Sequence, residues 1–145
     1  MDAQKDQHLD REAPLTEAPE AMRLKGLRVL VVEDEALVAL QLEDMLSELG
    51  CRVVGPASRV GQGLDLLSTE TVDAAVLDLN VAGELVYPVA KSLADQGHPF
   101  IFVTGYGASG VAADYRDRQI LQKPILLGQL RKAMLAAIPA ISNVP

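Results

Sequence analysis

The sequence predicts a doubly wound α/β fold, in which helices cover both faces of a five-stranded parallel sheet. Short apolar runs rich in β-branched residues recur along the chain, as expected for strands that are buried on both faces. These runs alternate with longer stretches, most of which have apolar residues at helical spacing. The length of 145 residues suits one domain with one sizeable core.

Each of the five expected strands is a mostly apolar run, with a polar residue near its carboxyl end or shortly after it. They are 27–33 (LRVLVVE), 52–56 (RVVGP), 73–78 (DAAVLD), 99–105 (PFIFVTG) and 120–124 (ILQKP). Crossovers between parallel strands are right-handed, and the expected strand order is 2-1-3-4-5, the flavodoxin-like arrangement. The third strand is then the central one.

Four helices are expected from the apolar periodicity. They cover a stretch from Val38 to Leu49, about Arg59 to Ser68, about Glu84 to Gln96, and 126–138. Gly50 and Gly97 end the first and third of these helices, and Ser58 can cap the second. The region 105–119 has three glycines and weak periodicity, so a helix there should be short or labile.

Composition and charge limit the function classes. Residues 1–25 hold six acids, four bases and two prolines, which predicts a flexible acidic tail before a domain at 26–139 and a short tail at 140–145. A net charge of −7 disfavours binding to nucleic acid or anionic membranes. A single cysteine and the lack of a signal or membrane-spanning segment predict a cytoplasmic protein.

Charged and hydroxyl residues collect where the expected strands end. In an open α/β sheet, ligands bind beyond the carboxyl ends of the strands, so these residues are candidates for a site. They are Glu33, Asp34 and Glu35 after the first strand, Asp78 after the third, Thr104 after the fourth and Lys123 in the fifth. Alone, the acidic triplet could complement a helix N-terminus, and each other residue could be a loop or surface residue.

Because these residues are all expected at one edge of the sheet, they favour a site for a metal and a phosphoryl group. Clustered carboxylates repel one another unless a cation offsets their charge, and Mg²⁺ prefers oxygen ligands such as Glu33, Asp34, Asp78 and the Asn80 carbonyl. Thr104 and Lys123 beside the metal could contact phosphoryl oxygens, and a carboxylate could be the nucleophile. Asp78, at the end of the central strand, is the best candidate.

These motifs resemble the receiver domain of two-component response regulators, the CheY-like family, from about Leu27 to Ile138. The matching pieces are VLVVEDE, the AAVLD strand end, FVTG and QKP. The resemblance implies that Asp78 accepts a phosphoryl group from a histidine kinase or phosphotransfer protein. It also implies that Glu33 and Asp34 hold Mg²⁺, with Asp34 and Asp78 as direct ligands, and that Thr104 and Lys123 contact the phosphoryl oxygens.

Two positions depart from the usual receiver pattern. Receivers usually have a proline four residues after the acceptor and an aromatic residue three before the lysine, where this chain has Ala82 and Ile120. An aliphatic Ile120 cannot perform the usual aromatic rotation. We therefore hypothesise that Tyr106 and the loop from Gly105 to Gly110 supply the switch; the alternative is that Tyr106 only packs against a neighbouring loop.

The segment PFIFVTGY resembles a subgroup of single-domain receivers with the motif Pro-Phe-x-Phe-Ala-Thr-Gly-Gly/Tyr, the FAT GUY type, although Val103 replaces the alanine. That subgroup is associated with alphaproteobacterial general stress signalling and with kinases of the HWE type. The expected protein is a stand-alone receiver that signals to a downstream protein target and has at most slow self-dephosphorylation. The alternatives are a Mg²⁺-dependent phosphatase, which needs a second aspartate where Asn80 stands, and a receiver-like binding module that is not phosphorylated.

Overall fold

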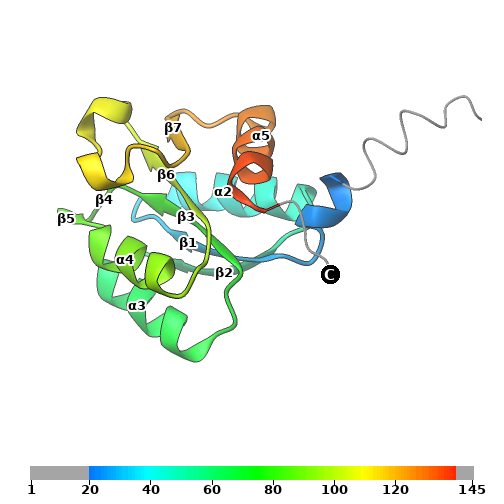
Figure 1. The fold of residues 1–145 in the computed structure, drawn as a ribbon, viewed down its shortest axis with the longest axis horizontal. Helices are drawn as coiled ribbons and strands as arrows, with labels where there is room; N and C mark the ends of the chain where they lie inside the picture. Colours follow the sequence, from blue (N-terminus) through cyan, green and yellow to red (C-terminus); the bar gives the residue numbers. More distant parts are fainter. Residues whose placement is uncertain (1–19, 140–145) are drawn as a thin grey trace, which may run out of the picture.

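The computed structural model describes residues 20–139 and contains a five-stranded parallel sheet, shown in Figure 1. The strands are β1 (Arg28–Val32), β2 (Arg52–Ala57), β3 (Ala74–Asp78), β6 (Phe100–Thr104) and β7 (Ile120–Gln122). Their order across the sheet is β2-β1-β3-β6-β7, which confirms the expected order 2-1-3-4-5. The central strand β3 is buried along its whole length, because helices cover both faces of the sheet.

Four helices form the outer layers. Helices α2 (Ala36–Glu48) and α5 (Leu127–Ala137) cover one face, and α3 (Val60–Thr69) and α4 (Tyr87–Asp95) cover the other (Figure 1). The doubly wound class predicted from the sequence is therefore confirmed. Within residues 20–139, no helix is both long and apolar enough to span a membrane.

The apolar core lies in two layers separated by the sheet. Alternate residues of β1 point to opposite faces: Val29 and Val31 pack toward α2 and α5, and Leu30 and Val32 toward α3 and α4. On the second face, Gly63 allows α3 to lie close to the sheet, because a Cβ at this position would be 3.1 Å from Val32 Cγ2. Packing therefore explains this glycine.

The region after β3 differs from the expected loop and helix. A small antiparallel hairpin of β4 (Asn80–Val81) and β5 (Glu84–Leu85) precedes α4, so the helix begins at Tyr87 and not near Glu84. At the hairpin turn, Ala82 and Gly83 both have positive φ, of 53° and 84°. This pair of values is typical of the tight turns that join antiparallel strands.

The cap expected for the second helix is also different. Ser58 does not cap α3, whose N-cap residue is Arg59 without a side-chain cap hydrogen bond. Instead, the Ser58 hydroxyl lies 3.0 Å from Gln62 Oε1 and donates to it. The hydroxyl thus satisfies a side-chain acceptor rather than accepting from the helix backbone.

The segment 105–119, between β6 and β7, forms two single 3₁₀ turns, η1 (Ala108–Gly110) and η2 (Ala113–Tyr115). The short or labile helix expected here is therefore absent as an α-helix. Its glycines and short side chains favour turns over a continuous helix. This segment lies beside α4 in Figure 1, coloured yellow to orange.

The folded part begins earlier than the sequence suggests. Residues 20–24, expected within the tail, are helical, and Leu24 is buried in the core layer that faces α2 and α5. The Arg23 guanidinium donates hydrogen bonds to the carbonyls of Leu135 and Ile138, at 2.8 and 2.7 Å. The remaining expected tails, 1–19 and 140–145, lie outside the described residues.

Candidate functional site

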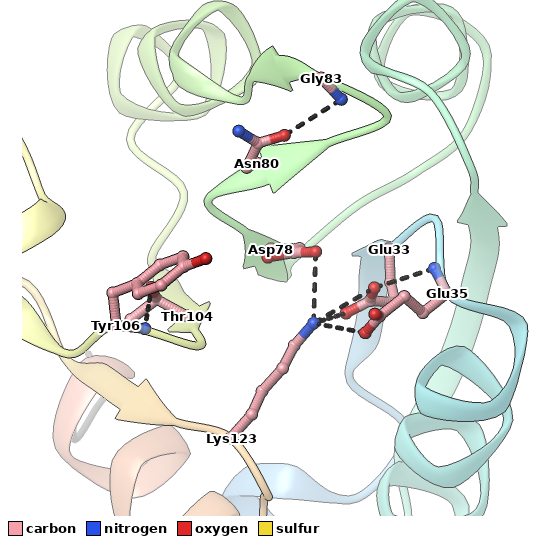
Figure 2. Close-up of polar contacts among 8 residues, drawn as sticks. All are labelled: Glu33, Glu35, Asp78, Asn80, Gly83, Thr104, Tyr106 and Lys123. Atoms are coloured by element: carbon pink, nitrogen blue, oxygen red, sulfur yellow. Dashed lines mark hydrogen bonds and ion pairs between the residues drawn. The ribbon is translucent and has the colours of Figure 1, made fainter.

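The candidate residues meet at the carboxyl edge of the sheet, as their strand positions predict. Glu33 follows β1, Asp78 ends β3, Thr104 ends β6 and Lys123 follows β7. Backbone hydrogen bonds fix these ends, since Lys123 N–H donates to the Thr104 carbonyl at 2.9 Å. Figure 2 shows the four side chains around a common space. A cleft of about 640 Å³ opens there, lined by Asp34, Glu35, Asp78, Leu79, Asn80, Leu85, Thr104, Gly105, Tyr106, Gly110 and Lys123.

Three carboxylates form the acidic part of the cleft. Glu33, Asp34 and Asp78 each offer an oxygen, and these oxygens lie within 4.8 Å of one another. Glu33 and Asp78 are buried, with 2% and 7% of their surface exposed, and Asp34 is exposed. Two buried acids at this separation are unfavourable when both are charged, unless a cation lies between them.

The pKa values of the two buried acids reflect this cost. Burial raises the pKa of Glu33 from 4.5 to about 7, against the lowering effect of a hydrogen bond from the Glu35 N–H. Burial also raises the pKa of Asp78, while the charge of Lys123 lowers it. Without a metal, the cluster therefore holds protons more tightly than ordinary carboxyl groups do.

Lys123 extends across the cleft toward Glu33, Glu35 and Asp78, as Figure 2 shows. Its Nζ lies 3.0 Å from Glu35 Oε1, 3.2 Å from Glu33 Oε1 and 3.4 Å from Asp78 Oδ2. Burial lowers the pKa of Lys123, but the Glu35 hydrogen bond and the charges of Asp78 and Glu33 raise it above the ordinary value. The ammonium group is thus charged and lies beside the side chain expected to react.

The acid cluster fits a divalent oxygen-binding ion. Glu33 Oε1 is buried and makes no hydrogen bond among the described residues, although Lys123 lies 3.2 Å away. A buried carboxylate oxygen without a donor is costly, and a cation that binds it removes the cost. Hard ions such as Mg²⁺ prefer these ligands. The side chain of Asn80 instead accepts a hydrogen bond from Gly83 N–H at 3.0 Å, which leaves its backbone carbonyl as the candidate ligand.

The expected switch residues lie on the other side of the cleft. Thr104 is buried, with 2% of its surface exposed, and its hydroxyl accepts a hydrogen bond from the Tyr106 N–H at 3.1 Å. The Tyr106 side chain is 86% exposed, and Gly105 and Tyr106 both line the cleft. Ile120 is half-buried and packs against the core on the α3 and α4 face. The structure therefore links Thr104 directly to the start of segment 105–119.

The sequence did not predict the contact between Glu35 and Lys123, nor Leu85 as a residue that lines the cleft. Glu35 has the shortest contact with Lys123, and Leu85 and Gly110 complete the cleft. Glu35 belonged to a recognisable acidic triplet, but its partner is distant in sequence. Leu85 enters the cleft through the β4–β5 hairpin, in a region where the sequence predicted a loop around Gly83 followed by a helix from about Glu84.

Comparisons with known proteins agree with this geometry. The family model of the response regulator receiver domain matches residues 29–135. SdrG from Sphingomonas melonis Fr1 is 40% identical, with a TM-score of 0.71, over 78% of this chain and 96% of that chain. A second SdrG structure, 39% identical, has been solved in its BeF3-activated conformation. PhyR from Brucella abortus is 25% identical, with a TM-score of 0.73, over 92% of this chain and 56% of that chain.

Curated relatives are longer than the region they share with this chain. The sensory transduction protein LytR of Staphylococcus haemolyticus is 29% identical over 121 residues, which are 81% of this chain and 47% of LytR. For the transcriptional regulatory protein PdtaR of Mycobacterium tuberculosis, the shared region is 64% of its length. The family match nevertheless spans four of the five strands, all of β1 but Arg28, and the clustered acids, lysine and threonine of the cleft. The chain belongs to the response regulator receiver domain family.

Proposed function

We propose that this receiver accepts a phosphoryl group on Asp78 from a phosphohistidine of a histidine kinase or phosphotransfer protein. A carboxylate oxygen of Asp78 attacks the phosphorus atom, and the bond between phosphorus and the imidazole nitrogen breaks. The imidazole leaves with the electron pair of that bond. The product is an aspartyl phosphate, so the chain is modified once and does not turn over substrate as an enzyme would.

One observation carries this proposal: the Asp78 carboxylate, the Lys123 ammonium and the Glu33–Asp34 pair face one cleft. Lys123 neutralises charge on the oxygens of the transferring group, and the Thr104 hydroxyl donates a hydrogen bond to one of them. Glu33, Asp34, Asp78 and the Asn80 carbonyl would hold Mg²⁺. When bound, the ion supplies further neutralisation of the phosphoryl charge.

The direct test is incubation with acetyl phosphate and Mg²⁺, followed by mass spectrometry of the intact protein. We expect one phosphoryl group per chain in the wild type and none in Asp78→Asn, which keeps the shape of the side chain but is a poor nucleophile. Asp73→Asn is the matched control, since Asp73 accepts the Arg28 N–H at the opposite end of β3 and should leave phosphorylation intact. An unmodified wild type would exclude the proposal.

A phosphatase would give a different result in the same experiment. Such an enzyme needs a general acid close to the nucleophile, and Asn80 occupies the nearby position with its side-chain oxygen engaged in the hairpin turn. We therefore expect the phosphorylated chain to accumulate and to lose its phosphate only slowly. Fast, steady release of phosphate without accumulation of a phosphorylated chain would favour the phosphatase instead.

For the phosphodonor, we propose histidine kinases of the HWE type as first candidates. The segment from Pro99 to Tyr106 carries the motif that resembles receivers associated with these kinases, and SdrG shares 40% identity with this chain. Phosphotransfer from a panel of purified kinases, with Asp78→Asn as the blank, tests this choice. Faster transfer from kinases of other types would contradict it.

We further propose that Thr104 and Tyr106 begin the response to phosphorylation, which then passes to a partner protein by contact. A phosphoryl group adds negative charge and strong acceptor oxygens to the cleft, and these draw the Thr104 hydroxyl toward Asp78. Tyr106 follows because its N–H donates to that hydroxyl. Thr104→Val removes the hydroxyl that accepts the Tyr106 N–H. If this variant keeps the phosphorylation-induced NMR shifts of residues 105–117, the route through Thr104 and Tyr106 is excluded.

A further inference from the structure

Segment 105–119 is attached to the rest of the protein by an aromatic contact. Tyr115 stacks on Tyr87 of α4, with ring centroids 5.4 Å apart and an angle of 8° between the ring planes. The Tyr115 ring also meets Phe100 and Phe102 of β6 edge-on, at 6.0 and 5.8 Å. These separations are those at which aromatic pairs attract one another. Tyr115 therefore holds η2 against both the helix and the sheet.

A second attachment lies a few residues before Tyr115. The Ala112 N–H donates a hydrogen bond of 2.7 Å to the Tyr87 hydroxyl oxygen, and Val111 is 1% exposed. The residues around these two points, from Ala108 to Gly110 and from Ala112 to Asp114, are exposed. These two contacts both involve Tyr87 or the core beside it, and a third contact lies further along the segment, where the Arg118 guanidinium carbon is 4.2 Å from the centroid of the Phe100 ring.

Tyr87 is in turn close to the site through the backbone. The preceding residue, Val86, is fully buried, and its N–H donates to the carbonyl of Leu79 at 3.0 Å. Leu79 follows Asp78 directly and lines the cleft together with Gly110. Asp78 and segment 105–119 are therefore connected by two routes, one through Thr104 and Tyr106 and one through Leu79, Val86 and Tyr87.

We propose that the Tyr87–Tyr115 stack is a latch that holds segment 105–119 in its resting position and opens when Asp78 is phosphorylated. This inference rests on the proposed function and describes how the same site is regulated. When Thr104 moves toward a phosphoryl group, Gly105 and Tyr106 move with it, and the anchors at Val111 and Tyr115 resist the change. Tyr115 acts through this segment and is a positioning residue. Receivers usually have an aromatic switch residue at the position of Ile120 in β7. Here Tyr115, which lies outside β7, takes over that role.

A latch that is present only in the resting state has a thermodynamic consequence. Weakening it lowers the free energy needed to reach the active state, so any ligand that favours that state binds more tightly. Beryllofluoride with Mg²⁺ is a suitable probe, because it mimics the phosphoryl group without forming a product that hydrolyses. Loss of one stacked aromatic pair should tighten its binding by about twofold to tenfold.

Calorimetric titration of beryllofluoride at fixed Mg²⁺ compares the wild type with Tyr115→Leu, which keeps an apolar side chain but cannot stack. Tyr115→Phe is the matched control: it keeps the ring and should bind as the wild type does. Tyr87→Phe keeps the stack and removes only the hydroxyl that Ala112 uses, so it should give a smaller gain. This variant also tests the latch if Tyr115→Leu does not fold.

The tyrosines themselves provide a second measurement. The chain has three tyrosines and no tryptophan, so in Tyr106→Phe the stacked pair are the only tyrosines that contribute to the near-ultraviolet spectrum. We expect the near-ultraviolet circular dichroism of this variant to fall when beryllofluoride and Mg²⁺ are added. A purely structural role for Tyr115 would leave this signal unchanged by the ligand.

The outcomes separate the latch from the proposed function. Equal affinities in all variants, with a tyrosine signal that does not respond to the ligand, would overturn the latch while leaving Asp78 as the acceptor. A wild type that does not bind beryllofluoride at all would overturn both. Tighter binding by Tyr115→Leu together with a ligand-dependent signal supports the latch.

Discussion

At the residue scale, Glu33 has the most consequential environment in the molecule. It is almost fully buried, one of its oxygens lacks a hydrogen bond, and its pKa is raised from 4.5 to about 7 by burial. The unfolded chain releases the proton near pH 4.5, whereas the folded chain keeps it until about pH 7. The stability that this difference provides is therefore fully present below pH 4.5 and is lost as the pH rises through 7.

We expect the unfolding free energy of the metal-free protein to fall between pH 5 and pH 8. Because the folded chain binds the Glu33 proton more tightly than the unfolded chain does, deprotonation of Glu33 lowers the unfolding free energy. Burial also raises the pKa of Asp78, so the deprotonation of Asp78 likewise lowers the unfolding free energy as the pH rises. Urea unfolding at a series of pH values, with a chelator present, measures the slope.

Glu33→Gln is the control for this prediction, because glutamine has nearly the same shape and does not titrate. Its unfolding free energy should vary less with pH than that of the wild type. Saturating Mg²⁺ should also reduce the loss at high pH, since the ion binds the deprotonated carboxylates. A metal-free wild type that is equally stable at pH 5 and pH 8 would contradict the assignment.

At the scale of elements, the β4–β5 hairpin explains why this chain departs from the usual receiver pattern. Ala82 stands where receivers usually have proline, and its φ of 53° is left-handed. The proline ring fixes φ near −65°, so proline cannot adopt this turn. Alanine adopts it at a cost, because its Cβ crowds the following carbonyl oxygen.

Replacing Ala82 with glycine should therefore stabilise the protein by about 0.5–1 kcal/mol, after the greater freedom of glycine in the unfolded chain is taken into account. Ala82→Pro should destabilise it and disrupt the hairpin. Denaturant unfolding of both variants gives the two values. If Ala82→Gly were less stable than the wild type, the turn would not carry the strain inferred from its backbone.

The strands and the site could be predicted because both depend on local patterns. A strand buried on both faces must be apolar, and the carboxyl ends of parallel strands share one edge, so Asp78, Thr104 and Lys123 had to meet. The hairpin and segment 105–119 could not be predicted in this way. The hairpin requires a left-handed alanine, and η2 depends on Tyr115 meeting Tyr87, a contact set by the tertiary fold.

At the scale of the whole molecule, the start of the described chain is joined to its last helix. Residues 20–24 looked like part of a tail because residues 1–25 carry many charges and two prolines, yet Leu24 reaches the core and Arg23 reaches α5. The carbonyls at the end of a helix have no partners within it. Arg23, from a distant part of the chain, donates hydrogen bonds to carbonyls at the end of α5. Glu20 forms an ion pair of 3.4 Å with Arg131, which also belongs to α5.

Arg23→Ala should therefore lower the unfolding free energy by about 1–3 kcal/mol, because two carbonyls at the end of α5 lose a charged donor. Arg131→Ala is the matched control: it removes the more exposed ion pair with Glu20 and should cost less than about 1 kcal/mol. Both variants should still be phosphorylated by acetyl phosphate, since the cleft lies at the opposite end of the strands. Equal stabilities of Arg23→Ala and wild type would show that α5 is held by its apolar face alone, through residues such as Leu130 and Met134.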